Sequence, residues 1–171
     1  RLSGQNSTQN RLIYWTVNGA AWNDFIEVDT LAKSGTISLK SNNLPVFTWV
    51  EKWADTVEDH YDVYYTDMLE PGVFKKRFIA SESKNPTVVL DFNDRPYLVL
   101  SEETDNGAFE LACYKILDAI YERSVIAVGT LGFWTNKLYR ANSHIYLITV
   151  RQSDAILPYG AILFFRMKAV N

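Results

Sequence analysis

Short segments rich in Val, Ile, Tyr, Phe and Thr recur along this chain, separated by Gly, Pro, Asn or Asp. The first group of residues suits the pleated surface of a sheet, and the second group suits turns. The expected strands are Leu12–Val17, Phe25–Thr30, Thr36–Lys40, Tyr61–Thr66, Val73–Ala80, Thr87–Phe92, Tyr97–Ser101, Val125–Trp134, His144–Arg151 and Ala161–Val170. So many short strands at irregular spacing predict a β-sandwich or barrel rather than an alternating βαβ fold.

Two segments show apolar residues at helical spacing instead of strand alternation. The two stripes are Trp49, Val50, Trp53, Ala54 and Val57, and Phe109, Ala112, Cys113, Ile116, Leu117 and Ile120. Asn43 can cap the first segment and Pro45 suits a first helical turn, while Asp105 and Asn106 can cap the second. We therefore expect two short helices in connections between strands, with their apolar stripes packed against the sheets.

The composition is that of a folded chain with a substantial core. Of its 171 residues, 47% are hydrophobic and 14% aromatic. We expect residues 11–171 to form one mainly β domain, and the polar residues 1–10, RLSGQNSTQN, to be a flexible lead-in. A formal net charge of −3 is not that of a basic nucleic-acid binder. No run approaches the roughly 18–20 apolar residues of a membrane span, so no membrane partner is expected.

The last two expected strands are apolar on both alternating faces. In HIYLITV, Ile145 and Leu147 alternate with Tyr146, Ile148 and Val150. AILFFRMKAV begins with two apolar faces and ends with basic residues on one of them. A strand that is apolar on both faces is covered on both. The second cover is either another part of the same chain, such as a long loop, or a neighbouring subunit.

The sequence holds no arrangement that indicates an enzyme. It contains two histidines and one cysteine, and no phosphate loop, nucleophile elbow or zinc-binding helix motif. Ser143 and His144 are adjacent on an expected strand, so they point to opposite faces and cannot form a nucleophile–base pair. His60 is expected to be structural or exposed. Cys113 lies on an apolar stripe, which predicts a buried thiol.

Asp91, Asn93 and Asp94 surround a turn in LDFNDRP. Oxygen ligands clustered on a loop can contribute to a Ca²⁺ site, which needs about six to eight oxygens. These three residues supply too few ligands, so such a site would need a second loop or a second subunit. The alternative is an ordinary turn held by hydrogen bonds to Asn and Asp side chains.

FKKRF places Lys75 and Arg77 on one face of an expected strand and Lys76 on the other. Three cations so close together can contact the phosphates of a nucleic acid. The alternative is a solvated strand face without a ligand.

A strand, an Asn, a Pro, a Trp-bearing segment and a Tyr follow one another between Gly35 and Tyr61. The residues in this order are Ile37, Leu39, Asn43, Pro45, Trp49, Val50, Ala54 and Tyr61. The order resembles the shell domain of small icosahedral RNA-virus coat proteins, of the tombusvirus, carmovirus, sobemovirus and nodavirus type. PTVVLDFNDRP is similar to the family's mid-domain strand with its Asp-rich turn. The final hairpin, whose last strand opens at Gly160, is similar to the family's closing hairpin.

The resemblance implies an antiparallel eight-stranded jelly-roll β-sandwich with two short helices in inter-strand connections. It further implies a non-enzymatic viral capsid protein whose copies self-assemble into an icosahedral shell around the genome, in a virion. Asp91 and Asp94 would hold Ca²⁺ at a subunit interface, and Lys75, Lys76 and Arg77 would contact nucleic acid. The family also holds its genomic nucleic acid with a basic N-terminal arm, which does not occur in this sequence.

A second function suits the same sandwich. Trp15, Trp22, Tyr64 and Tyr65 belong to a surplus of aromatic residues, and aromatic rings can stack on sugar faces. The alternative is therefore a ligand-binding, non-enzymatic surface domain that recognises a glycan or a receptor.

Overall fold

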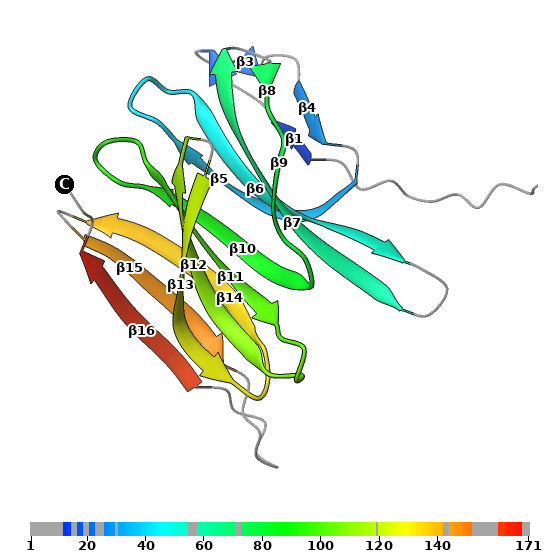
Figure 1. Ribbon diagram of the computed structural model, residues 1–171. Coiled ribbons are helices and arrows are strands. Elements are labelled where there is room, and N and C mark those ends of the chain that lie inside the picture. The colour runs from blue at the N-terminus through cyan, green and yellow to red at the C-terminus, as the bar shows by residue number, and fades with distance from the viewer. Residues whose placement is uncertain are drawn as a thin grey trace, which may run out of the picture.

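The computed structural model describes residues 12–14, 17–18, 21–22, 26–29, 31–54, 58–70, 73–118, 120–141, 144–151 and 161–168. Every helix or strand element within these ranges is a β-strand, and the paired strands run antiparallel (Figure 1). The prediction of a mainly β, antiparallel protein is therefore confirmed. The described residues include no helix with the length and apolar character needed to span a membrane.

Three large sheets follow one another along the chain. The first sheet contains β5 (Ala32–Leu39), β6 (Pro45–Ala54), β7 (Asp59–Glu70), β8 (Val73–Phe74) and β9 (Arg77–Ala80). The middle sheet contains β10 (Ser83–Leu90), β11 (Pro96–Glu103), β12 (Phe109–Leu117) and β13 (Ile120–Gly129). The third sheet contains β14 (Phe133–Ala141), β15 (His144–Arg151) and β16 (Ala161–Lys168). Before them, β1 (Leu12–Tyr14) pairs with β4 (Ile26–Asp29), and β2 (Val17–Asn18) pairs with β3 (Ala21–Trp22).

Within the large sheets, strands pair with their neighbours in sequence. The order is β10–β11–β12–β13 in the middle sheet and β14–β15–β16 in the third. The first sheet runs β5–β6–β7–β8, and β9 also pairs with β7. Such sheets are meanders, which consecutive hairpins build. The nested Greek-key order that defines a jelly roll does not occur among the described strands.

The prediction of a first helix is wrong, because residues Pro45–Ala54 form strand β6. The apolar side chains of this strand lie on both of its faces. Val46 and Val50 belong to one core cluster, and Phe47 and Trp49 belong to another on the opposite side. A strand buried on both faces carries apolar residues at consecutive positions, and such a run also matches the spacing of a helical stripe.

The prediction of a second helix is wrong for the same reason. Residues Phe109–Leu117 form strand β12 in the interior of the middle sheet. Leu111 and Cys113 pack into the core on one side of that sheet, and Ala112 and Tyr114 pack into the core on the other. Cover from both sides therefore removes the alternation of polar and apolar residues that identifies a half-exposed strand.

Other predicted segments differ from the structure in their bounds. The expected strand Val73–Ala80 is two strands, β8 and β9, with Lys75 and Lys76 between them. The expected strand Val125–Trp134 contains the turn between β13 and β14, so most of β14 was not predicted. The lead-in expected at residues 1–10 and the position of Gly160 lie outside the described residues.

The three large sheets form layers with the middle sheet between the other two (Figure 1). One core cluster joins the first sheet to the middle sheet, with Val63 and Tyr65 of β7 against Leu98 and Leu100 of β11. A second cluster joins the middle sheet to the third sheet through residues such as Leu111, together with Val99, Phe133, Ile145 and Leu147. Strands β10, β11 and β12 of the middle sheet are thus largely buried on both faces, whereas β13 is mostly exposed.

Strand β10 forms one edge of the middle sheet, and side chains of its neighbours bind this edge. The Val88 amide donates to Thr36 Oγ1 of β5 over 3.1 Å. On the other side, Asn136 Nδ2 of β14 donates to the Asn85 carbonyl over 2.9 Å, and Asn85 Nδ2 donates to the Phe133 carbonyl over 3.0 Å. The first strands of the three sheets therefore lie together, joined by bonds that satisfy backbone groups the β-ladder leaves open.

We expect Leu100→Ala to lower the free energy of unfolding by about 2–5 kcal/mol, because it opens a cavity between two layers. Leu100 is 0% exposed. Leu39→Ala is the matched control, since Leu39 is 57% exposed and its loss should cost less than about 0.5 kcal/mol. Urea denaturation of both variants measures the difference, and equal losses would contradict the layered core.

Candidate functional site

The third sheet has one covered face and one open face. The covered face contributes Phe133, Ile145 and Leu147 to the core shared with the middle sheet. The opposite face, which we call the outer face, carries Trp134, Lys137, Tyr139, Tyr146, Ile148, Val150, Ile162, Phe164, Arg166 and Lys168. Ile162 is 75% exposed, Phe164 62% and Trp134 54%, which are high values for side chains of this size and polarity.

Strand pairing aligns the outer-face side chains in rows across the three strands. The rows are Trp134, Val150 and Ile162; Lys137, Ile148 and Phe164; and Tyr139, Tyr146 and Arg166. The rings of Tyr146 and Phe164 stack with their centroids 5.7 Å apart. These neighbours form one contiguous apolar surface, which is the kind of surface that marks an interaction site in a folded protein.

Two of the three cations of the outer face lie at one end of it. Arg166 and Lys168 lie near the end of β16, Ile162 and Phe164 lie toward its start, and Lys137 lies in the middle row. Within the described ranges, no carboxylate pairs with Lys137, Arg166 or Lys168. The outer face therefore has an apolar end and a basic end.

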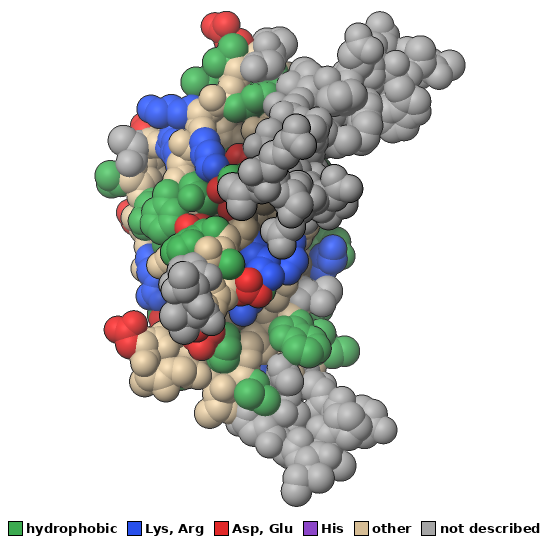
Figure 2. Space-filling model, turned by 90° about the vertical axis from the view of Figure 1, so that its right-hand side faces the viewer, with side chains coloured by type: hydrophobic (Ala, Val, Ile, Leu, Met, Phe, Trp, Pro, Cys, Tyr) green, Lys and Arg blue, Asp and Glu red, His purple; other side chains and the backbone are tan. Residues whose placement is uncertain are grey.

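Exposed apolar side chains on another side of the molecule are distributed differently. Figure 2 shows hydrophobic side chains there in separate patches, with charged side chains between them. Single exposed apolar residues among charged ones are normal for a protein surface. The contiguous rows of the outer face are the feature that requires an explanation.

The two carboxylates proposed as Ca²⁺ ligands bind protein groups. Asp91 is buried, and its Oδ1 accepts the backbone amides of Asn93 and Arg95 over 2.8 and 2.9 Å. Asp94 reaches the turn between β5 and β6, where Oδ1 and Oδ2 accept the Ser41 amide over 2.9 and 3.0 Å. Among the described residues there is no group of three or more His, Cys, Asp or Glu that could hold a metal ion. The geometry favours the turn interpretation.

The three cations of FKKRF point to different surroundings. Lys76 forms ion pairs with Asp29 and Glu51, and its Nζ lies 4.0 Å from the centroid of the Tyr64 ring. Arg77 donates to the backbone carbonyl of Asp118. Lys75 has no ion-pair partner among the described residues and lines a cleft. The structure therefore does not bring Lys75, Lys76 and Arg77 into a single patch.

The two histidines lie in different sheets. The His60 ring stacks on Trp53 with centroids 4.2 Å apart, and its Nδ1 lies 2.5 Å from Glu82 Oε1. His144 opens β15, where its ring approaches Tyr146 with centroids 6.2 Å apart.

The aromatic residues considered for sugar stacking are not a free platform. Tyr65 is 1% exposed and belongs to the core between the first two sheets. Tyr64 is half-buried, with its ring beneath Lys76 and stacked on Trp49 at 5.9 Å. The side chains of Trp15 and Trp22 lie outside the described part of the structure.

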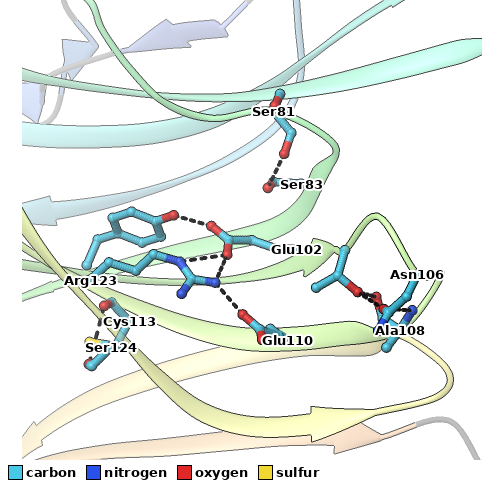
Figure 3. A network of polar contacts seen from close by, with 11 residues as sticks. Ser81, Ser83, Glu102, Asn106, Ala108, Glu110, Cys113, Arg123 and Ser124 are labelled. Atoms are coloured by element: carbon cyan, nitrogen blue, oxygen red, sulfur yellow. Dashed lines mark hydrogen bonds and ion pairs between the residues drawn. The ribbon is translucent and has the colours of Figure 1, made fainter.

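A polar network that the sequence did not reveal crosses β11, β12 and β13 (Figure 3). The Tyr114 hydroxyl donates to Glu102 Oε1, and Arg123 binds both Glu102 and Glu110. Burial, followed by the bond to Glu102, raises the pKa of Tyr114, and the bonds to the two carboxylates raise the pKa of Arg123. Both groups therefore keep their protons at neutral pH, and their hydrogen bonds to Glu102 and Glu110 link the three strands.

Comparison with models of known protein families and with curated proteins finds no match for this chain.

We expect native Cys113 to react with a maleimide or a disulfide reagent at pH 8 only very slowly. Cys113 is 4% exposed, and burial raises the pKa of its thiol to about 11, so only about 0.1% would be thiolate at that pH. Thiol labelling of the native and the urea-unfolded protein measures this, and the unfolded protein should react quickly. Equal rates would contradict the buried position.

We expect neither calcium nor a chelator to change the melting temperature, because protein donors already bind Asp91 and Asp94 in this structure. A ligand that binds the folded state raises its stability in proportion to RT ln(1 + [L]/Kd), so a real site would be visible. Thermal unfolding with calcium chloride, magnesium chloride or a chelator is the measurement. A rise seen with calcium alone would restore the metal interpretation.

Proposed function

We propose that this protein is a non-enzymatic structural protein that self-assembles, with the outer face of β14–β16 buried against a second copy of the chain. The observation that supports this most directly is the exposure of Trp134, Ile162 and Phe164 in contiguous rows on one sheet face. Burying one such large apolar side chain is more favourable than leaving it in water by roughly 1.5–3 kcal/mol.

The faces of the middle sheet show what an apolar sheet face requires in this protein. Leu98, Leu100 and Leu111 are 0% exposed because sheets cover them from both sides. The third sheet is covered by the middle sheet on one face, and its outer face is similarly rich in aromatic and branched side chains. Another antiparallel sheet, packed at the usual separation of about 10 Å, is the cover of matching shape.

The position of the cations selects one arrangement of two copies. If a two-fold axis lies in the interface across the strands, the strands of the two copies run in opposite directions. Arg166 of one copy then lies over the Trp134–Ile162 end of the other, where a guanidinium can interact with the Trp134 ring. Ile162 and Lys168 are six positions apart, which corresponds to roughly 20 Å along the strand, so the basic ends stay apart. Parallel strands would place the basic ends of the two copies together.

Lys137 is compatible with this dimer because it lies on β14, an edge strand of the third sheet. Its long aliphatic stem can cover apolar surface while its ammonium group remains in water. A dimer of this kind is isologous, which is the commonest symmetry of soluble oligomers.

The viral coat function is a more specific proposal built on the same self-assembly. It rests on the sequence resemblance, and it places the copies in an icosahedral shell, in a virion, around a genome. The meander order of the described strands adds no support for the jelly-roll part of that prediction. Negative-stain electron microscopy of the purified protein, with and without a chelator, tests it: closed particles would support a coat protein, and small discrete oligomers would contradict it.

We expect Phe164→Arg to weaken self-association by about tenfold or more, because it removes a central apolar side chain and adds like charge to the interface. Size-exclusion chromatography with light scattering over a dilution series measures the dissociation constant. Val128→Arg is the matched control, because Val128 is 59% exposed on β13, outside the outer face. A wild-type chain that is monomeric at high concentration, or equal effects of the two variants, would contradict the proposal.

Cross-linking tests the orientation of the strands. In the antiparallel arrangement Ile148 lies near the two-fold axis, so Ile148→Cys copies should join efficiently with a short bis-maleimide. Val150→Cys lies one row away from this axis on the same strand, and its copies should join less efficiently. Equally efficient joining of the Ile148→Cys and Val150→Cys copies would show that the axis runs along β15 and that the strands of the two copies run parallel.

A further inference from the structure

A polar cleft of about 490 Å³ opens at one end of the first and middle sheets. It is lined by Lys40, by Arg95 of the turn between β10 and β11, and by Leu117 at the end of β12. An adjoining cleft of about 550 Å³ shares Asp67, Arg77, Ile116 and Asp118 with it. The two form one continuous depression, and each of them falls in the range of about 300–1,000 Å³ that holds small molecules.

One half of this depression is apolar and open. Its walls include Leu69, Phe78, Ile79, Ile120 and Tyr121. Phe78 is 51% exposed, Tyr121 45% and Ile120 67%. Two accessible rings and an isoleucine at the same site can take up the apolar or aromatic body of a ligand.

The carboxylates of the other half are largely engaged by protein donors. Asp67 Oδ2 lies 2.9 Å from Lys40 Nζ, and both side chains are mostly buried. Asp94 accepts the amide and hydroxyl of Ser41. Asp118 is exposed, so water surrounds its carboxylate. Most acidic oxygens of the depression therefore have protein or solvent partners, whereas Asp67 Oδ1 is buried and accepts no hydrogen bond from the described residues.

The cations of the depression are less engaged. Among the described residues, Lys75 and Arg95 have no side-chain partner, and Arg77 donates only through Nη1, to the Asp118 carbonyl. That bond holds the Arg77 guanidinium at the junction of the apolar and polar halves. Its remaining N–H groups have the planar fork geometry that pairs with a carboxylate or a phosphate.

We propose that this depression binds a small organic anion. Its carboxylate or phosphate lies on Arg77, with Lys75 and Arg95 nearby, and its apolar or aromatic body lies against Phe78 and Tyr121. The shared chemistry is an oxyanion attached to a hydrophobic group. This site is separate from the outer face, so its occupation does not depend on self-assembly.

The test uses four probes and an NMR titration of the full chain, followed through backbone amide shifts. Phenyl phosphate and benzoate carry both parts of the ligand, inorganic phosphate carries only the anion, and benzyl alcohol carries only the ring. We expect phenyl phosphate or benzoate to shift the amides near Arg77, Phe78 and Tyr121, and to bind about tenfold or more tightly than either half-probe. The stronger of the two complete probes identifies the anion.

The variants Arg77→Gln and Arg95→Gln should each weaken binding of that probe, with the larger loss, about tenfold, for Arg77→Gln. Lys84→Gln removes an exposed charge of the middle sheet outside the depression and is the control. Thermal unfolding checks that each variant is folded, and Arg95→Gln, at an exposed turn position, keeps the test informative if Arg77→Gln is unstable. Three results would each overturn the proposal. They are benzyl alcohol binding as tightly as benzoate, unchanged affinity in both arginine variants, and an equal loss of affinity in Lys84→Gln.

Discussion

Burial of the middle sheet from both sides is the constraint on which the rest of this structure depends. The leucines at its centre lie between two other sheets, and each layer excludes water from the next. The free edge of β10 is bound by Thr36 from one neighbour and by Asn136 from the other. Since these bonds satisfy backbone groups that the ladder leaves open, the three meanders are held in a defined order and not merely stacked.

The same principle makes the outer face of the third sheet the most informative surface of the molecule. Trp134, Ile148 and Phe164 are the kind of side chains that the middle sheet buries, yet they are open to water in the single chain. In the proposed dimer, this apolar surface supplies the contact between the copies, and the cations of the face select how the two copies lie.

The groups that look related in the sequence are separated by the fold, and unrelated ones are brought together. Lys75, Lys76 and Arg77 are consecutive, but Lys76 is held by Asp29 and Glu51 while Arg77 turns toward β12. Arg95, distant in sequence, lines the same depression as Arg77. A cluster of charges along a chain therefore identifies neither a patch nor its ligand until the strands that carry the charges are placed.

The sequence by itself determined that this chain is mainly β, because Val, Ile, Tyr, Phe and Thr segments between turn residues hold that information locally. It also showed that β15 and β16 have two apolar faces, and it identified Cys113 as buried. Only the tertiary structure decided that β6 and β12 are strands. It also decided which residues of β14 lie on the outer face and which residues meet in the depression around Arg77. A strand that is buried on both faces does not alternate between polar and apolar residues. The segments around Trp49 and Ala112 therefore match helical spacing until the neighbouring sheets are known. Clefts arise where turns distant in sequence meet, and no local pattern of residues encodes that meeting.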